Sequence, residues 1–197
     1  MSESAASPAQ WSRDHPWSVS TVAERALLVR ERSDGSYIVA TSRWGGTDRM
    51  LAAVCAGIPP TALPSISWES QKAQPDFLSA IASMDILSTE LLYRVIGGET
   101  TLFLPLWFGL PLASTTTHPT VGALVAIESL PDARALRRWF RALKGSLADA
   151  VTNGTLPLTA VPLVLVAAVV HRSGRERYLL AHPGIAVPLL TNAGPDG

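Results

Sequence analysis

The stretch that decides the fold covers residues 24–44 and reads ERALLVRERSDGSYIVATSRW. It contains two β-prone runs that are joined at Ser33-Asp34-Gly35, where Asp-Gly supplies the positive φ of a tight hairpin turn. The charged residues Arg30, Glu31 and Arg32 keep the turn end of the hairpin in water. This stretch therefore predicts a β-hairpin, the first unit of a sheet.

Two further pairs of β-prone runs lie downstream of this hairpin. Leu91–Ile96 and Thr101–Leu106 flank Gly97-Gly98, which predicts a second hairpin. Val161–Val170 and Arg177–Ala181 flank a charged turn, which predicts a third. We therefore expect the sheet to be built mainly from hairpins.

Three segments carry the start and stop signals of helices. Thr47 or Asp48 can cap a short helix that stops at Gly57, and a second helix is expected from Pro75 to about Leu87. The longest helix is expected over residues 132–152, where apolar residues recur at helical spacing on one stripe. These residues are Leu136, Trp139, Phe140, Leu143, Leu147 and Val151.

Hairpins interleaved with helices define the fold class. Residues 121–127 are expected to form a buried strand, and the Pro- and Ser-rich residues 58–74 an exposed loop. With 197 residues, of which 47% are hydrophobic, the chain can close one core. We predict a single α+β domain over residues 21–190, in which two or three helices cover an antiparallel or mixed sheet. A disordered leader (1–20) and a flexible tail (191–197) flank it.

The composition argues against several classes of function. Lys and Arg total 16, as do Asp and Glu, so no overall charge attracts nucleic acid or an anionic membrane. The lone Cys55 and the absence of an apolar run near the N-terminus predict a cytoplasmic location. Residues 100–127 and 150–170 are uncharged and long enough to span a membrane, but prolines such as Pro111 and Pro162 interrupt both. We therefore expect no membrane contact.

Several short segments of the chain together form a sequence pattern that occurs in other proteins. They are Arg25–Val29, Glu31-Arg32, Asp34-Gly35, Tyr37, Ser42-Arg43-Trp44-Gly45 and, more loosely, Leu106–Leu110 and Arg138–Leu143. Over about half of its length the chain thus resembles an uncharacterised family of small haloarchaeal proteins that open with a hairpin ending in Ser-His-Trp-Gly. Arg43 stands where that family has His. The resemblance implies a shared fold and an archaeal source, but no activity.

One cluster at the end of the first hairpin is a candidate ligand site: Ser42, Arg43, Trp44, Gly45 and Gly46. A strand that ends in a hydroxyl, a guanidinium and a glycine turn before a helix N-terminus can hold a phosphate or a carboxylate. The alternative is a structural strand end, in which Trp44 packs on the core. Catalysis would also need a histidine within hydrogen-bond reach of Ser42 or Thr41.

The long helix carries a basic stripe that consists of Arg134, Arg137, Arg138, Arg141 and Lys144. Such a stripe can meet phosphates or an acidic partner, and the alternative is a solvated helix face. Trp107 and Phe108 can form either a protein interface or a wall of the core.

The remaining candidates for chemistry are a thiol and two histidines. Cys55 is expected to be a small buried hydrophobe. His171 and His182 could face each other across the third hairpin, but two imidazoles alone do not complete a metal site. We therefore expect no metal and no cofactor.

No nucleophile motif such as G-x-S-x-G accompanies the four histidines. We therefore expect a cytoplasmic binding or interaction protein without catalytic activity, whose possible protein partner contacts Trp107 and Phe108. The alternatives are a small hydrolase or transferase that uses the Ser42–Gly46 turn, and a weak nucleic-acid binder that uses helix 132–152.

Overall fold

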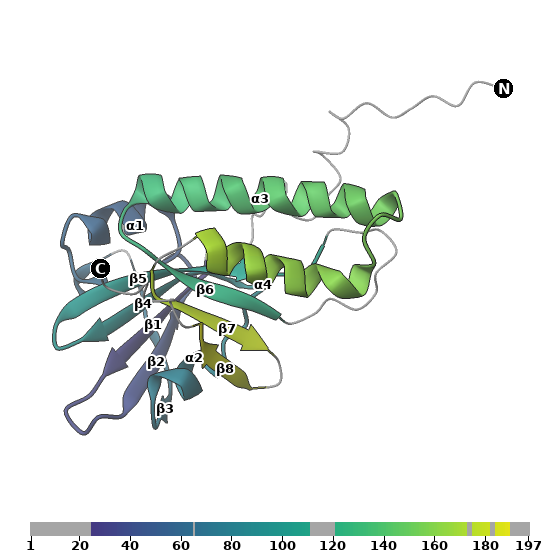
Figure 1. Ribbon diagram of the computed structural model, residues 1–197. Helices are drawn as coiled ribbons and strands as arrows, with labels where there is room; N and C mark the ends of the chain where they lie inside the picture. Colours follow the sequence, from purple (N-terminus) through teal and green to yellow (C-terminus); the bar gives the residue numbers. More distant parts are fainter. Residues whose placement is uncertain (1–24, 65, 111–120, 173–174, 182–183, 190–197) are drawn as a thin grey trace, which may run out of the picture.

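The computed structural model describes residues 25–64, 66–110, 121–172, 175–181 and 184–189 (Figure 1). The predicted leader (1–20) and tail (191–197) lie outside these residues. The strands are β1 (Arg25–Glu31), β2 (Tyr37–Ser42), β3 (Glu69–Gln74), β4 (Thr89–Ile96), β5 (Glu99–Trp107), β6 (Val121–Ile127), β7 (Arg177–Ala181) and β8 (Ile185–Pro188). The helices are α1 (Asp48–Cys55), α2 (Phe77–Ala82), α3 (Leu130–Thr152) and α4 (Val161–Arg172), with short 3-10 helices at Pro60–Ala62 and Leu158–Ala160.

All eight strands form one sheet in the order β3-β2-β1-β4-β5-β6-β7-β8. Strands β1 and β4 pair in parallel, whereas every other neighbouring pair is antiparallel. The sheet is therefore mixed, and the single-domain α+β fold is as predicted.

The first two predicted hairpins are confirmed. β1 and β2 pair from Ala26–Ser42 to Glu31–Tyr37, and Gly35 has the positive φ, 79°, that the turn requires. β4 and β5 pair up to Ile96–Glu99, so that Gly97 and Gly98 form a two-residue loop with φ values of 57° and 90°. Both loops place glycine where L side chains are disfavoured.

The third predicted hairpin is wrong, because residues 161–170 form most of helix α4 and not a strand. β7 pairs instead with β6 and β8. The run VPLVLVAAVV is apolar without alternation, and periodicity cannot separate a buried strand from a buried helix in such a run. Pro162 fits the first turn of this helix.

Two edge strands were not predicted. Residues 58–74 contain β3, whose sequence ESQKAQ has no apolar alternation to mark it as a strand. The other edge strand, β8, has four residues only. Both strands are recognisable only from the neighbours with which they pair.

Side-chain caps define where the helices begin. Thr47, Asp76 and Ser129 cap α1, α2 and α3, each by accepting a hydrogen bond from the backbone N–H three residues later. Helix α3 agrees closely with the predicted 132–152, whereas α2 ends at Ala82 and not near Leu87. None of the described helices combines the length and the apolar content that crossing a membrane requires.

The sheet separates two hydrophobic cores. On one face, α1, α3 and α4 pack against a core that includes Leu28 and Tyr93. On the other, the sheet curls around α2 and encloses a smaller core that includes Leu27, Phe77 and Phe103 (Figure 1). Because side chains alternate along a strand, residues two apart from Leu27 face α2. We call this second side of the sheet the α2 face.

Candidate functional site

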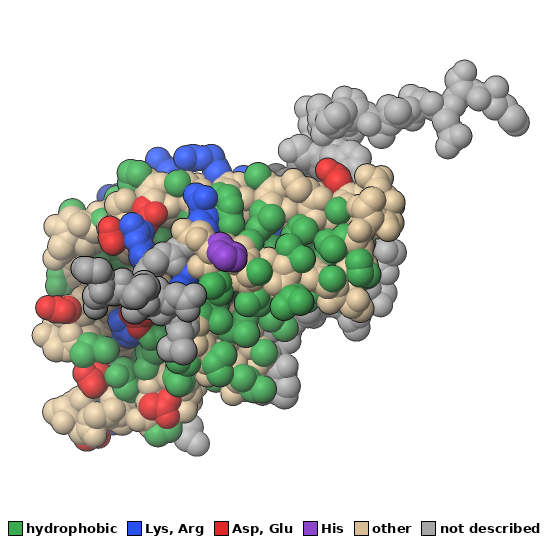
Figure 2. All heavy atoms as spheres, viewed as in Figure 1, with side chains coloured by type: hydrophobic (Ala, Val, Ile, Leu, Met, Phe, Trp, Pro, Cys, Tyr) green, Lys and Arg blue, Asp and Glu red, His purple; other side chains and the backbone are tan. Residues whose placement is uncertain are grey.

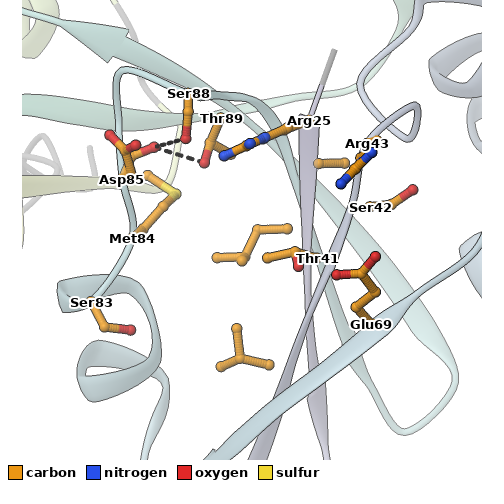
Figure 3. A pocket seen from close by; sticks show the side chains of 13 residues that line it. Arg25, Thr41, Ser42, Arg43, Glu69, Ser83, Met84, Asp85, Ser88 and Thr89 are labelled. Atoms are coloured by element: carbon orange, nitrogen blue, oxygen red, sulfur yellow. Dashed lines mark hydrogen bonds between the residues drawn. The ribbon is translucent and has the colours of Figure 1, made fainter. Parts of the chain in front are cut away.

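A cavity of about 300 Å³ opens at one end of the α2 face. Its walls come from β1, β2, the start of β3 and the connection of residues 83–89 between α2 and β4 (Figure 3). Two arginines, Arg25 and Arg43, line it together with hydroxyl and carboxylate groups. We call this site the Arg25–Arg43 cavity.

The pairing of the strands explains why these side chains meet. Arg25 lies two residues before Leu27, so both project onto the α2 face. Thr41 pairs with Leu27 across the hairpin, and Arg43 follows two residues later on the same side. Glu69 pairs with Thr41 from β3. Three neighbouring strands thus bring a hydroxyl, a carboxylate and two guanidiniums to one end of the sheet.

The charges at this site are not neutralised within the described part of the chain. There, neither Arg25 nor Arg43 has an ion-pair partner or a side-chain hydrogen bond, and the same holds for Glu69. The two guanidiniums and the Glu69 carboxylate point into the cavity, whereas the Asp85 carboxylate points away from it (Figure 3). The groups that face the cavity therefore carry a net positive charge.

The connection of residues 83–89 supplies two ordered hydroxyl groups. The Thr89 hydroxyl donates to the Asp85 carbonyl oxygen at 2.8 Å, and the Ser88 hydroxyl donates to the same oxygen at 3.5 Å. The backbone N–H of Leu87 donates to Asp85 Oδ1 at 3.1 Å and closes the turn. Because the Thr89 hydroxyl proton is engaged, its oxygen is left to accept a hydrogen bond from a ligand.

The structure divides the predicted Ser42–Gly46 cluster. Arg43 points into the cavity, but the Ser42 side chain points away from it (Figure 3). Ser42 is only 4% exposed, and its Oγ accepts a hydrogen bond of 3.4 Å from the Trp44 backbone N–H. Trp44 is 56% exposed, which contradicts the packing on the core that the structural alternative assumed.

Gly45 and Gly46 are buried parts of the turn. The Tyr93 hydroxyl donates to the Gly45 carbonyl oxygen at 2.6 Å. A Cβ on Gly45 would lie 2.7 Å from Ala26 Cβ, which is closer than two such atoms approach. Gly45 is thus explained by packing, and only Arg43 of the predicted cluster contributes its side chain to the cavity.

Sequence reasoning missed Arg25, Glu69 and Thr89 as companions of Arg43. For Arg25 a signal was present, because it precedes Leu27 by two residues on a predicted strand and faces the same side as Thr41. For Glu69 and Thr89 there was none, since β3 and the parallel pairing of β1 with β4 are long-range features.

The basic stripe on α3 is partly neutralised. Arg134 donates to Asp48 Oδ2 through Nε at 3.0 Å and through Nη2 at 2.8 Å, and Arg137 donates to Asp48 Oδ1 at 3.2 Å. These bonds attach α3 to the start of α1. Arg138 and Arg141 are exposed and have no ion pair with any described residue.

Lys144, the last member of the stripe, is withdrawn from solvent. Its Nζ lies 4.3 Å from the centre of the Trp107 ring and donates to the Trp107 carbonyl oxygen at 3.3 Å. Burial lowers the pKa of Lys144 to about 8. Phe108 is fully buried and Trp107 is half-buried, so Phe108 has no surface to offer a partner.

The predictions for Cys55 and His171 need correction. Cys55 is exposed at the C-terminal end of α1, although it follows the buried Leu51 by four residues. Partial burial nevertheless raises the pKa of its thiol. His171 lies at the exposed C-terminal end of α4 and not on a strand, and His182 lies outside the described residues. In the described ranges, no three potential metal ligands come together.

No family model, no curated protein and no solved structure matches this chain. The haloarchaeal resemblance of the opening hairpin therefore stays a prediction. What remains to indicate the function is the chemistry of the Arg25–Arg43 cavity.

Proposed function

We propose that this protein is a cytoplasmic small-molecule binding protein without catalytic activity, and that its ligand is an anion held in the Arg25–Arg43 cavity. The observation that carries the proposal is that two arginines from neighbouring strands line one cavity, and neither has an ion-pair partner in the described chain. Guanidinium groups bind carboxylates and phosphates in a bidentate manner, so two of them that line one cavity favour an anionic ligand.

The other groups of the cavity narrow the ligand class. Glu69 accepts hydrogen bonds and repels a second anionic group, so the part of the ligand near β3 should carry hydroxyl or amino donors. The oxygens of Ser88 and Thr89 can accept from such donors as well. A small hydroxylated carboxylate or a sugar phosphate has both features.

The position of Ser42 favours binding over hydrolysis or group transfer. A serine nucleophile needs a base within hydrogen-bond reach and access to the substrate. The Ser42 side chain points away from the cavity, and His171, the histidine in the described ranges, has no hydrogen bond to Ser42 or Thr41. The same contacts argue against the hydrolase or transferase alternative.

The ion pairs on α3 make nucleic-acid binding a poorer explanation of the basic residues. Asp48 neutralises much of the charge of Arg134 and Arg137, and Lys144 lies against Trp107. Arg138 and Arg141 remain exposed on the stripe. Two phosphate contacts give little affinity for nucleic acid at physiological salt.

The proposal is tested by measuring the melting temperature of the purified protein with inorganic phosphate, citrate and ribose 5-phosphate, and then the affinity by calorimetry. A ligand that binds only the native state raises the melting temperature by mass action. Arg25→Gln or Arg43→Gln should each weaken binding about tenfold or more, because each removes a charge-assisted hydrogen-bond donor.

Arg30→Gln is the matched control, since Arg30 is an exposed arginine of the same strand that faces the opposite side of the sheet. It should leave the affinity unchanged. If no anion of the panel binds, or if Arg30→Gln weakens binding as much as the two cavity variants, the proposal is wrong.

A further inference from the structure

The two long helices on the same face of the sheet have very different outer surfaces. Helix α3 exposes charged residues, among them Arg138, Arg141 and Asp149. Helix α4 has no charged residue from Val161 to Val170, and its Leu163 is 73% exposed. A helix that is apolar on all sides is normally enclosed by protein or lipid. Among the described residues, none covers the outer side of α4, although its composition is that of an enclosed helix.

The apolar surface continues from α4 onto the edge of the sheet. Leu158, just before α4, is 42% exposed, and Ile185 and Val187 on β8 are 55% and 42% exposed. Ala186 packs into the core of the α2 face, so its neighbours Ile185 and Val187 face the side that carries α4. Figure 2 shows hydrophobic side chains gathered over α4 and continuing over β7 and β8. We call this surface the α4 face.

Basic groups border the α4 face. The Arg172 guanidinium, at the C-terminal end of α4, lies 4.6 Å from the centre of the Trp139 ring and so connects α4 with α3. Arg138 is exposed on α3, one residue before Trp139. Neither of these two arginines has an ion pair with a described residue.

We propose that the α4 face binds the surface of an anionic lipid bilayer, with the apolar side of α4 at the level of the headgroups and the arginines among them. Surface-bound helices combine exposed apolar residues with basic residues in this way, and they lie in the interface without spanning the membrane. Each arginine near an anionic surface strengthens binding about fivefold, which corresponds to about 1 kcal/mol. Arg138 and Arg172 therefore suffice for weak, reversible attachment.

A lipid surface fits the α4 face better than a second copy of the chain does. Helix α4 has 12 residues and is about 18 Å long, so a contact between two such helices falls well short of the roughly 1,200 Å² of a stable interface. Extension of the sheet through β8 is also disfavoured, because a four-residue edge strand that ends in Pro188 is a poor template for pairing. A bilayer requires neither a large complementary area nor an open strand.

The test is sedimentation of the purified full-length protein with phosphatidylcholine vesicles that contain or lack phosphatidylglycerol. Binding should require the anionic lipid and decrease as salt is raised.

Leu163→Asp should reduce binding about tenfold or more, because it places a carboxylate in the apolar contact. Leu87→Asp, a change of an exposed leucine outside the α4 face, is the matched control and should bind like the wild type. Arg138→Gln combined with Arg172→Gln should reduce binding to anionic vesicles about 25-fold.

Three results would overturn the proposal. The first is no binding to anionic vesicles. The second is equal binding by Leu163→Asp and wild type. The third is a dimer in light scattering that Leu163→Asp dissociates, since the α4 face would then be a contact between copies. Melting curves of every variant separate these results from unfolding.

Discussion

The two ends of the α2 face use arginine in opposite ways. At one end, Arg94 forms a bidentate pair with Glu176, at 2.5 and 2.7 Å, and lies 5.1 Å from the ring centres of both Phe77 and Phe103. Its Nη2 also donates to the Thr101 hydroxyl at 3.2 Å. This guanidinium joins β4 and β5 to the residue before β7 and to α2, so its charge serves the fold.

At the other end, Arg25 and Arg43 face a cavity and have no such partners among the described residues. Their removal should leave the fold intact, whereas removal of Arg94 should not. The comparison shows how the two kinds of arginine on this face differ. An arginine with several intramolecular partners stabilises the fold, whereas an arginine without such partners is a candidate for ligand binding.

The largest effect is expected for Arg94→Met, which should lower the free energy of unfolding by about 2–3 kcal/mol. The change leaves Glu176 without its partner, and the loss stays below the roughly 3–5 kcal/mol of a fully buried pair because the Glu176 side chain is 39% exposed. Urea denaturation measures the change, and Arg30→Met is the control, with an expected loss below about 0.5 kcal/mol. Equal losses for both variants would contradict the structural role of Arg94.

A smaller effect is expected at Tyr178, whose hydroxyl contacts both Glu176 and Arg94. Burial, together with the hydrogen bond to Glu176, raises the pKa of Tyr178 to about 12. The neutral phenol is thus favoured in the folded state, so its contribution is present below pH 10 and is lost as the pH rises from about 10 to about 12.

Tyr178→Phe should therefore lower stability by about 1 kcal/mol at neutral pH and flatten the decrease above pH 10. Urea denaturation of both proteins at pH 8 to 11.5 measures this difference. A parallel decrease in the two proteins would show that another group, and not Tyr178, causes the alkaline loss.

The sequence predicted the fold correctly where a few neighbouring residues determine the local structure. Asp34-Gly35 and Gly97-Gly98 specify their turns, and Ser129 marks the start of α3. It was misleading for residues 161–170, since β-branched residues without alternation fit a strand as well as a helix. The parallel pairing of β1 with β4 follows from packing over a long separation in sequence, which no local pattern encodes.

The site was predicted less well than the fold. Arg43 was found because a strand end before a glycine turn is a local motif, and Arg25 could have been found from the alternation along β1. The pairing that places Glu69 beside Thr41, and the neutralisation of Arg134 by Asp48, depend on contacts between distant segments. These contacts decide which arginines remain available, and one sequence does not reveal them.

The smallest effect on stability is expected for the two arginines of the Arg25–Arg43 cavity. Arg25→Gln and Arg43→Gln should each change the free energy of unfolding by less than about 0.5 kcal/mol, because both side chains are exposed and have no described partner to lose. A gain in stability would be the stronger result, because it would mean that the two like charges repel each other across the cavity, a repulsion that a bound anion would relieve. Denaturation in buffers with and without phosphate separates the cases, since phosphate should stabilise the wild type more than either variant. A loss of stability comparable to that of Arg94→Met would contradict the difference between Arg94 and the two cavity arginines.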